Sequence, residues 1–356
     1  MRWNPAEVRS ARELRVTPAE KRRIVEKFPL AADCRPYVDA VFSGGGVRCL
    51  AFLGAMRCLD DVGIRVRKAG GTSAGSVCAA AIAAQLPMDL AEKRIGALDF
   101  ETLLTNGGRF GSDPARALDN IACLLLTLEV SRSTGRHPTA PLRRWVHELL
   151  RGHPDTFPQL RATSAGWHAE RELRVVVSDI SAGEMRILPD DLHLYGEDAA
   201  EFSVAEAVTL SMSIPLFFEP GALGPDRNTI VDGGILSNFP VWIFDQTGCE
   251  RPRCPTLGFQ LHAAHVPPRQ VTTALDMVSA IVQTMRDAGD LHYLKHNDYG
   301  RIVSIQCPDV SATNFALSAA DKDELYAAGY ECTKRFLLDV WDWDAHLAAR
   351  GVRSRA

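Results

Sequence analysis

Two glycine-rich turns, each placed between a strand pattern and a helix pattern, constrain the fold of this chain more than any other feature. Strand, turn and helix follow one another over residues 37–62 and again over residues 64–85. The turns themselves read SGGG at 43–46 and GGTSAG at 70–75. Repeated units of this kind build a parallel sheet that is covered by helices. We therefore expect an α/β fold of three layers, in which helices flank a mostly parallel central sheet.

The rest of the chain shows no internal repeat and no low-complexity linker. Residues 88–168 are mostly helical in pattern and predict a mainly helical insertion. We expect a lead-in helix over 1–36 and a single catalytic domain over 37–356, with a motif core at 37–245 and a C-terminal extension at 246–356. Further strands are expected at 173–177 and 184–188 (as a hairpin), 229–231, 256–261 and 301–305, and further helices at 90–98, 115–128, 141–150, 204–212, 272–292 and 321–341.

Composition excludes several classes of protein. The 356 residues carry a formal net charge of −4, which argues against a general binder of DNA or RNA. The charged N-terminus has no apolar core of a signal peptide, and the longest apolar run is too short to span a bilayer. Nine irregularly spaced cysteines predict reduced thiols in a cytosol. We expect a cytoplasmic protein that contacts the inner membrane peripherally.

The second turn has the form G-x-S-x-G, with Ser73 between Gly71 and Gly75. A strand that turns at once into a helix forces the residue at the bend into a strained backbone conformation, and flanking glycines let strand and helix approach closely. The serine hydroxyl would then point away from the sheet, toward the positive end of the helix dipole. A plain tight turn with a serine N-cap is the alternative interpretation.

The first turn exposes consecutive backbone N–H groups at Gly44, Gly45 and Gly46 that can point at an anion. The lysine and serine or threonine of a phosphate-binding P-loop are missing, and a dinucleotide fingerprint fails at Cys49, where its third glycine would stand. No cofactor is expected. A developing oxyanion remains as the ligand, and Arg48, near the start of the next helix, would benefit from an anionic partner.

A third motif places an aspartate at the end of a short apolar strand, in Asp232-Gly233-Gly234. Desolvation in a closed site would raise the pKa of Asp232 and let it abstract a proton at neutral pH. An ordinary Asp-Gly turn is the alternative.

Taken together, these motifs resemble the patatin-like phospholipases over residues 37–245, in order and in spacing. Ser43 departs from the aspartate that many members carry before the three glycines. The matching residues are GGGVR at 44–48, GTSAG at 71–75, SMSIP at 211–215 with Phe217 and Phe218, and DGGILSNFP at 232–240.

The resemblance implies a serine–aspartate dyad, with Ser73 as nucleophile and Asp232 as base. It implies hydrolysis of acyl esters of phospholipids through an acyl-serine, and contact with a membrane, which the basic lead-in around 21–23 or exposed apolar residues of the cap would supply. Some similar bacterial members look like anti-phage effectors activated by a cyclic nucleotide, so we also consider such an activator, and a homo-oligomer. The supporting residues are Gly44, Gly45, Gly46 and Arg48 at the oxyanion loop, Gly71 and Gly75 at the nucleophile elbow, and Gly233 and Gly234 in the base motif.

Three other interpretations stay open. An α/β-hydrolase triad would add His262 or His265 to Ser73 and Asp232 in the appropriate chain order. A non-catalytic binding protein with this fold, or an acyltransferase or thioesterase that uses the same serine, fits the same motifs. No metal site is expected, because neither the pair Cys249 and Cys254 nor the pair His292 and His296 has further ligands at a suitable spacing.

Overall fold

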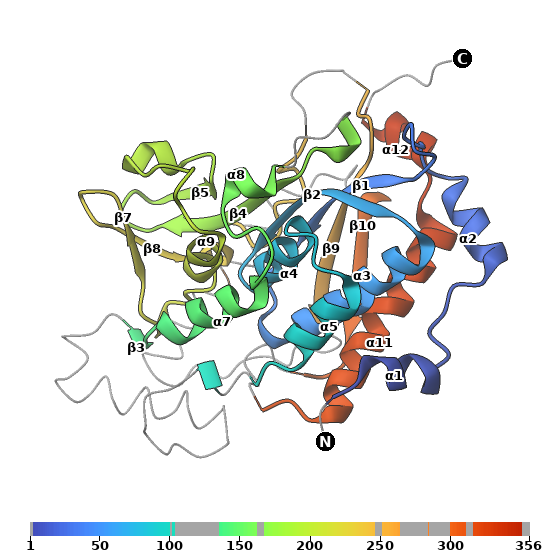
Figure 1. The fold of residues 1–356 in the computed structure, drawn as a ribbon, viewed down its shortest axis with the longest axis horizontal. Coiled ribbons are helices and arrows are strands. Elements are labelled where there is room, and N and C mark those ends of the chain that lie inside the picture. The colour runs from blue at the N-terminus through green and yellow to red at the C-terminus, as the bar shows by residue number, and fades with distance from the viewer. Residues whose placement is uncertain are drawn as a thin grey trace.

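The fold is built on one mixed, mostly parallel sheet of eight strands (Figure 1). The computed structural model describes residues 3–99, 102–103, 135–161, 167–245, 251–263, 284, 300–310 and 316–350. The strand order is β10-β9-β1-β2-β4-β8-β7, and β5 pairs with β4 outside this row. The strands are β1 (Tyr37–Phe42), β2 (Arg65–Thr72), β4 (Glu172–Asp179), β5 (Glu184–Leu188), β7 (Gly221–Leu223), β8 (Asn228–Asp232), β9 (Thr256–Ala263) and β10 (Ile302–Cys307).

Strand direction divides the sheet into two parts. The strands from β10 to β4 are mutually parallel, as the repeated strand–turn–helix pattern predicts. By contrast, β8 and β5 both pair antiparallel with β4, and β7 pairs antiparallel with β8. The hairpin of β4 and β5 is as expected, whereas the antiparallel entry of β8 was not foreseen, since an isolated short strand pattern carries no information about its direction.

Helices flank the sheet and confirm the expected fold class. On one face, α3 (Leu50–Val62), α4 (Ala74–Ala83) and α11 (Ala319–Arg335) enclose the main apolar core with the strands (Figure 1). Glycines bring α3 and α11 close together: a Cβ on Gly54 would lie 1.9 Å from the carbonyl oxygen of Tyr326, and one on Gly329 would lie 1.7 Å from that of Ala51. The backbones of the two helices are therefore in direct contact. This contact holds α3, the helix that follows the first glycine turn, in place.

The insertion between β2 and β4 is mainly helical where it is described, with one short strand, β3. It contains α5, α7 and α8, and the next helix along the chain, α9, matches its expected position. The expected helix at 115–128, and nearly all of the one at 272–292, lie outside the described residues. The remaining elements are α5 (Met88–Gly96), α7 (Ala140–Leu150), α8 (Phe157–Leu160), α9 (Val204–Ser211), α12 (Trp343–Ala349), and the two-stranded sheet of β3 (Gly135–His137) and β6 (Leu216–Phe218).

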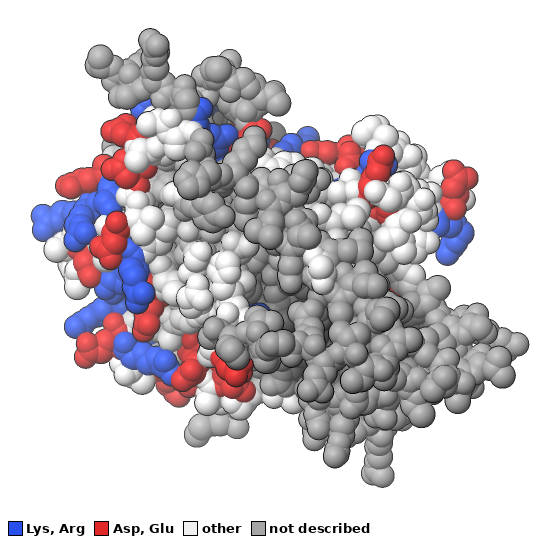
Figure 2. Space-filling view, turned by 180° about the vertical axis from the view of Figure 1, so that it is seen from behind, with Lys and Arg blue, Asp and Glu red and all other residues white. Residues whose placement is uncertain are grey.

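The lead-in forms two short helices, α1 (Pro5–Ala11) and α2 (Pro18–Val25), because a capping box at Thr17 starts a new helix. Their packing ties the lead-in to the C-terminal helices: the ring of Phe28 stacks on Trp341 at 5.3 Å, and the Lys27 ammonium donates to the carbonyl of Leu338 at 2.6 Å. Figure 2 shows basic and acidic side chains interspersed on the side that carries α2 and α11.

Within the described part of the chain, every helix falls short of the length and apolar character that a membrane span requires. The division into a lead-in and one catalytic domain stays a prediction.

Candidate active site

Ser73 stands at the bend between β2, which ends at Thr72, and α4, which begins at Ala74. Its backbone has φ 52° and ψ −132°, a conformation that non-glycine residues rarely adopt and that costs about 1–3 kcal/mol. Two serines support the bend: the Ser73 amide donates to Oγ of Ser211 at 2.8 Å, and Oγ of Ser76 donates to the Ser73 carbonyl at 2.6 Å. The expected sharp elbow is therefore present, and buried hydrogen bonds hold it.

The two flanking glycines are required by close approach. A Cβ on Gly71 would lie 2.6 Å from the carbonyl carbon of Gly75, and one on Gly75 would lie 2.4 Å from the carbonyl oxygen of Ser43. Strand, helix and the first glycine turn thus meet at a distance that only glycine permits.

Asp232 lies beside Ser73, although its strand, β8, runs in the opposite direction to β2. It ends β8 and pairs with Val177 of β4, directly beyond Val176, which pairs with Thr72 of β2. The ends of β2 and β8 therefore face each other across β4, and Oγ of Ser73 lies 2.6 Å from Oδ2 of Asp232. Both residues are buried, at 7% and 6% exposure.

Backbone amides orient the aspartate. Its second carboxylate oxygen, Oδ1, accepts from the Gly234 amide at 2.7 Å, and its own amide donates to the carbonyl of Ser213 at 2.9 Å. A Cβ on Gly233 would lie 2.2 Å from the carbonyl oxygen of Val176, so this turn also needs glycine. The Asp-Gly-Gly motif therefore leaves one carboxylate oxygen directed at Ser73 and ties the other to the backbone.

The first glycine turn lies against Ser73. A Cβ on Gly44 would be 3.2 Å from Cβ of Ser73, and the Gly44 amide donates to the carbonyl of Asn238 at 3.0 Å. The N–H groups of Gly45 and Gly46 take part in none of the backbone hydrogen bonds found among the described residues. These two amides are thus candidates for an oxyanion, whereas that of Gly44 is engaged.

Arg48 contacts the backbone near the edge of the sheet. Its Nε atom donates to the carbonyl of Val310 at 2.7 Å, beyond the end of β10. The guanidinium therefore joins the short helix that follows the glycine turn, Gly46–Cys49, to the edge of the sheet.

The SMSIP motif contains Ser211, but the sequence alone indicates no role for this residue. In the fold its hydroxyl accepts from the Ser73 amide and donates to the carbonyl of Val176 at 2.6 Å. SMSIP thus supplies one contact to each half of the pair, because Ser213 accepts from Asp232. A serine at the end of a helix pattern marks this position in sequence, but not its partner 138 residues away.

The other polar candidates take no part in the hydrogen bond between Ser73 and Asp232 where they are described. His262 lies in β9, where burial lowers its pKa, and Ser73 and Asp232 touch directly with no imidazole between them. His265, His292, His296 and Cys249 lie outside the described residues. Burial raises the pKa of the Cys254 thiol to about 12. Among the described residues no three histidines, cysteines or carboxylates gather to hold a metal ion.

A comparison with known protein families identifies the family that shares these motifs. The sequence profile described as "Patatin-like phospholipase" matches residues 40–245, which include both glycine turns and Asp232. The chain belongs to the patatin-like phospholipase family. This membership supports lipid hydrolysis as its general activity.

The chain is also similar to bacterial proteins in sequence and to a solved structure in fold. The chain is 35% identical over 306 residues to the uncharacterized protein YqhO of Bacillus subtilis (strain 168), which covers 85% of this chain and 98% of that protein. It is 30% identical over 289 residues to the uncharacterized NTE family protein MT2641 of Mycobacterium tuberculosis, where the match covers 76% of this chain but only 41% of that protein. The fold is similar to that of VipD from Legionella pneumophila, with a TM-score of 0.53 at 16% identity over 88% of this chain and 70% of that one.

Proposed function

We propose that the chain hydrolyses acyl esters of phospholipids through an acyl-serine intermediate, with Ser73 as nucleophile and Asp232 as general base. The observation that carries this proposal is the 2.6 Å contact between Oγ of Ser73 and Oδ2 of Asp232, in a patatin-like chain and at a strained strand-to-helix bend. A hydroxyl in direct contact with a carboxylate can transfer its proton as it attacks.

In the first half of the reaction, Oδ2 of Asp232 accepts the Ser73 proton while Oγ attacks the ester carbonyl carbon. The negative charge that develops on the carbonyl oxygen would be stabilised by the amides of Gly45 and Gly46, each worth roughly 3–4 kcal/mol when well placed. When the tetrahedral intermediate collapses, the carbon–oxygen bond to the alcohol breaks, and Asp232 returns the proton to the departing lysolipid.

In the second half, water replaces the lysolipid. Asp232 accepts a proton from water as the water oxygen attacks the acyl-serine, and the proton then returns to Oγ of Ser73 as the fatty acid leaves. Throughout, the Gly234 amide holds the other carboxylate oxygen, which keeps Oδ2 directed at the serine. An acyltransferase or thioesterase would differ only in the acceptor or the leaving group of the same cycle.

The proposal includes contact with a membrane surface, because the ester of a phospholipid lies within the bilayer. The basic lead-in is a weaker candidate for that contact than its sequence suggests, since the Lys21 ammonium donates to the Asp61 carbonyl at 3.0 Å and the Arg23 guanidinium to that of Leu338 at 3.1 Å. Activation by a cyclic nucleotide, a part in anti-phage defence and a homo-oligomeric state stay predictions of the family resemblance.

The test compares three purified variants on phospholipid vesicles, with the released fatty acid measured by mass spectrometry. We expect Ser73→Ala and Asp232→Asn each to lose about 10³-fold or more in rate, and His262→Gln to stay within a few-fold of wild type. Loss of activity in His262→Gln together with retention in Asp232→Asn would overturn the dyad.

A fluorophosphonate probe separates catalysis from binding. Mass spectrometry of the labelled wild-type protein should place the adduct on Ser73, and Ser73→Ala should take up none. Folded wild-type protein that stays unlabelled in the presence of vesicles would favour a non-catalytic binding protein.

A further inference from the structure

A cavity of about 470 Å³ lies between α3, α4, α5 and the beginning of β2, at a distance from Ser73. Its lining includes Met56, in the middle of α3, and Ile82, near the C-terminal end of α4. Because α4 begins directly after Ser73 and has 10 residues, at 1.5 Å per residue the cavity lies about 15 Å from the serine along the helix axis. It is therefore a separate space that Ser73 does not reach.

One wall of the cavity is apolar and its size suits a small molecule. Met56, Ile64 and Leu86 are buried at 7%, 3% and 9% exposure, and all three face this space. Val66, Ile82 and Met88 complete the wall. Sites for small ligands usually have volumes of about 300–1,000 Å³ and mostly apolar linings with a few placed polar groups.

Three arginines contribute to the lining, and two of them have carboxylate partners. Arg57 binds the buried Glu92 and the exposed Asp89. Arg65 lies 3.6 Å from the carboxylate of Asp60. The charges of these two guanidinium groups are therefore matched within the protein.

Arg171, the third arginine, is half-buried and differs from its neighbours. Its Nη1 atom donates to the carbonyls of His168 at 2.9 Å and Glu170 at 3.2 Å, and none of the described carboxylates forms an ion pair with it. Burial lowers the pKa of Arg171; the nearby Tyr37 partly opposes this, and the charges of Arg67 and Arg65 add to the lowering.

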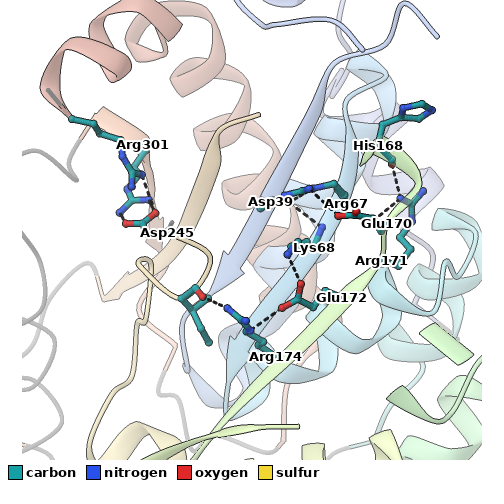
Figure 3. Close-up of polar contacts among 12 residues, drawn as sticks. Asp39, Arg67, Lys68, His168, Glu170, Arg171, Glu172, Arg174, Asp245 and Arg301 are labelled. Carbon is teal, nitrogen blue, oxygen red and sulfur yellow. Dashed lines mark hydrogen bonds and ion pairs between the residues drawn. The ribbon is translucent and has the colours of Figure 1, made fainter. Parts of the chain in front are cut away.

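The contrast with the adjacent network is visible in Figure 3. Arg67 pairs with Asp39, and both Lys68 and Arg174 pair with Glu172. Arg171, by contrast, donates to the backbone carbonyls of His168 and Glu170. Burial of a charge is costly unless an opposite charge or hydrogen bonds offset it. Arg171 therefore brings an unmatched positive charge to a cavity with an apolar wall.

We propose that this cavity binds an amphiphilic anion, with its carboxylate or phosphate head on Arg171 and its apolar chain against Met56, Ile82 and Leu86. A planar guanidinium donates two parallel hydrogen bonds to either kind of head group, and the ligand would supply the negative charge that Arg171 lacks. The chain would cover the apolar wall and exclude water from it. This site does not depend on whether Ser73 and Asp232 are catalytic.

The test uses isothermal titration calorimetry on the full-length wild-type protein, which cannot hydrolyse the probes because they contain no acyl ester. We expect octanoate and octyl phosphate to bind, and the comparison of the two identifies the preferred head group. Octanol, which has the same chain without a charge, should bind at least about 10-fold more weakly, and so should acetate and inorganic phosphate, which lack the chain.

Variants locate the site. Arg171→Gln should weaken binding of the better probe at least about 10-fold, whereas Arg151→Gln, an exposed arginine paired with Glu148, should leave it within about 2-fold. Ile82→Trp, which narrows the cavity without touching a charge, gives an independent check should Arg171→Gln fail to fold. Unchanged affinity in a folded variant of Arg171, or in Ile82→Trp, would overturn the proposal, as would octanol binding as tightly as octanoate.

Discussion

The amide of Ser73 donates to the hydroxyl of Ser211 at 2.8 Å, and that hydroxyl in turn donates to the carbonyl of Val176 at 2.6 Å. Ser211 thus connects the strained bend to the middle of β4, where Asp232 is also anchored by its pairing with Val177. The Ser211 hydroxyl therefore ties Ser73 to the strand with which the strand of Asp232 pairs. It would act as a positioning residue, because it contacts the backbone of Ser73 and not its hydroxyl.

Replacement of Ser211 by alanine should damage both stability and turnover. It leaves a buried amide and a buried carbonyl without partners, at a cost of about 1–3 kcal/mol in the free energy of unfolding. We expect kcat to fall at least about 10-fold with KM little changed, since the bend relaxes while the lipid surface is untouched. Urea unfolding and steady-state kinetics on phospholipid vesicles measure the two effects.

Ser213→Ala is the matched control for this change, because the hydroxyl of Ser213 donates only to the carbonyl of Thr209, one turn back in the chain. A kcat for Ser211→Ala equal to that of Ser213→Ala would show that the contact with Ser73 has no effect on catalysis.

Gly75→Ala should be among the most damaging single-methyl additions in the chain. The new Cβ would lie 2.4 Å from the carbonyl oxygen of Ser43 and 2.6 Å from that of Phe42, and neither backbone group can move without displacing the first glycine turn. We expect a loss of about 1–3 kcal/mol or more in the free energy of unfolding, and a large loss of fluorophosphonate labelling at Ser73.

Gly300→Ala provides the comparison, because a Cβ there would meet nothing within 4 Å. Differential scanning calorimetry should find its melting temperature close to that of wild type. Equal melting temperatures for the two variants would mean that α4 can shift away from β1 at little cost.

Asp245 should make the free energy of unfolding depend on pH in the acid range. Burial by itself would raise the pKa of this carboxyl, but its pairs with Arg301, at 2.7 Å, and with Arg350, at 2.8 Å, outweigh burial and lower it. A carboxyl with a lowered folded-state pKa stabilises the protein above its unfolded pKa of about 3.9, and that contribution disappears as the pH falls through the lower, folded value.

Asp245→Asn tests this linkage. Near neutral pH we expect the variant to lose about 3 kcal/mol, because Arg301, only 2% exposed, keeps its charge without its partner. Urea titrations from pH 7 to pH 2.5 should show the gap between variant and wild type closing only below about pH 4. Asp226→Asn, at an exposed turn, should follow wild type throughout. A gap that stayed constant to pH 2.5 would contradict the assignment.

Lys27 should matter for stability and not for attraction to lipid. Its ammonium donates to the carbonyls of Leu337 at 3.1 Å and Leu338 at 2.6 Å, which are acceptors at a helix end. Lys27→Met keeps the length of the side chain but removes these bonds, so we expect the free energy of unfolding to fall by about 1–3 kcal/mol.

Arg22→Gln, at an exposed position of α2, should change the unfolding free energy by no more than about 0.5 kcal/mol. Vesicle flotation of both variants should match wild type. A clear loss of flotation with either variant would restore the lead-in as a membrane contact.

Local sequence was enough to predict much of the fold. The strand–turn–helix unit expected over 37–62 is present, with its strand at Tyr37–Phe42, and both glycine turns join a strand to a helix as expected. The expected helix at 204–212 also appears, as α9. These features depend on residues within one or two turns of each other, through side-chain periodicity and the steric freedom of glycine.

The lead-in and the C-terminal helix were less well predicted. Helical spacing over the lead-in suggested one helix, but Thr17 and Pro18 start a second one. The last helix was expected at 321–341, yet α11 ends at Arg335 and a π-helical turn, Phe336–Val340, follows it. Helix caps and packing against Phe28 and Lys27 decide where these helices end. Helical periodicity in the sequence carries no information about either caps or packing.

By itself, the sequence determined which chemical groups stand at the ends of strands: a hydroxyl at 73, a carboxylate at 232 and a run of amides at 44–46. Only the tertiary structure decided that they meet. β8 enters antiparallel to β4, so Asp232 arrives from the far side of the sheet and stops where β2 stops. The physical reason is that strand pairing is chosen by the burial and hydrogen bonding of the whole sheet, whereas turn chemistry is decided within a few residues.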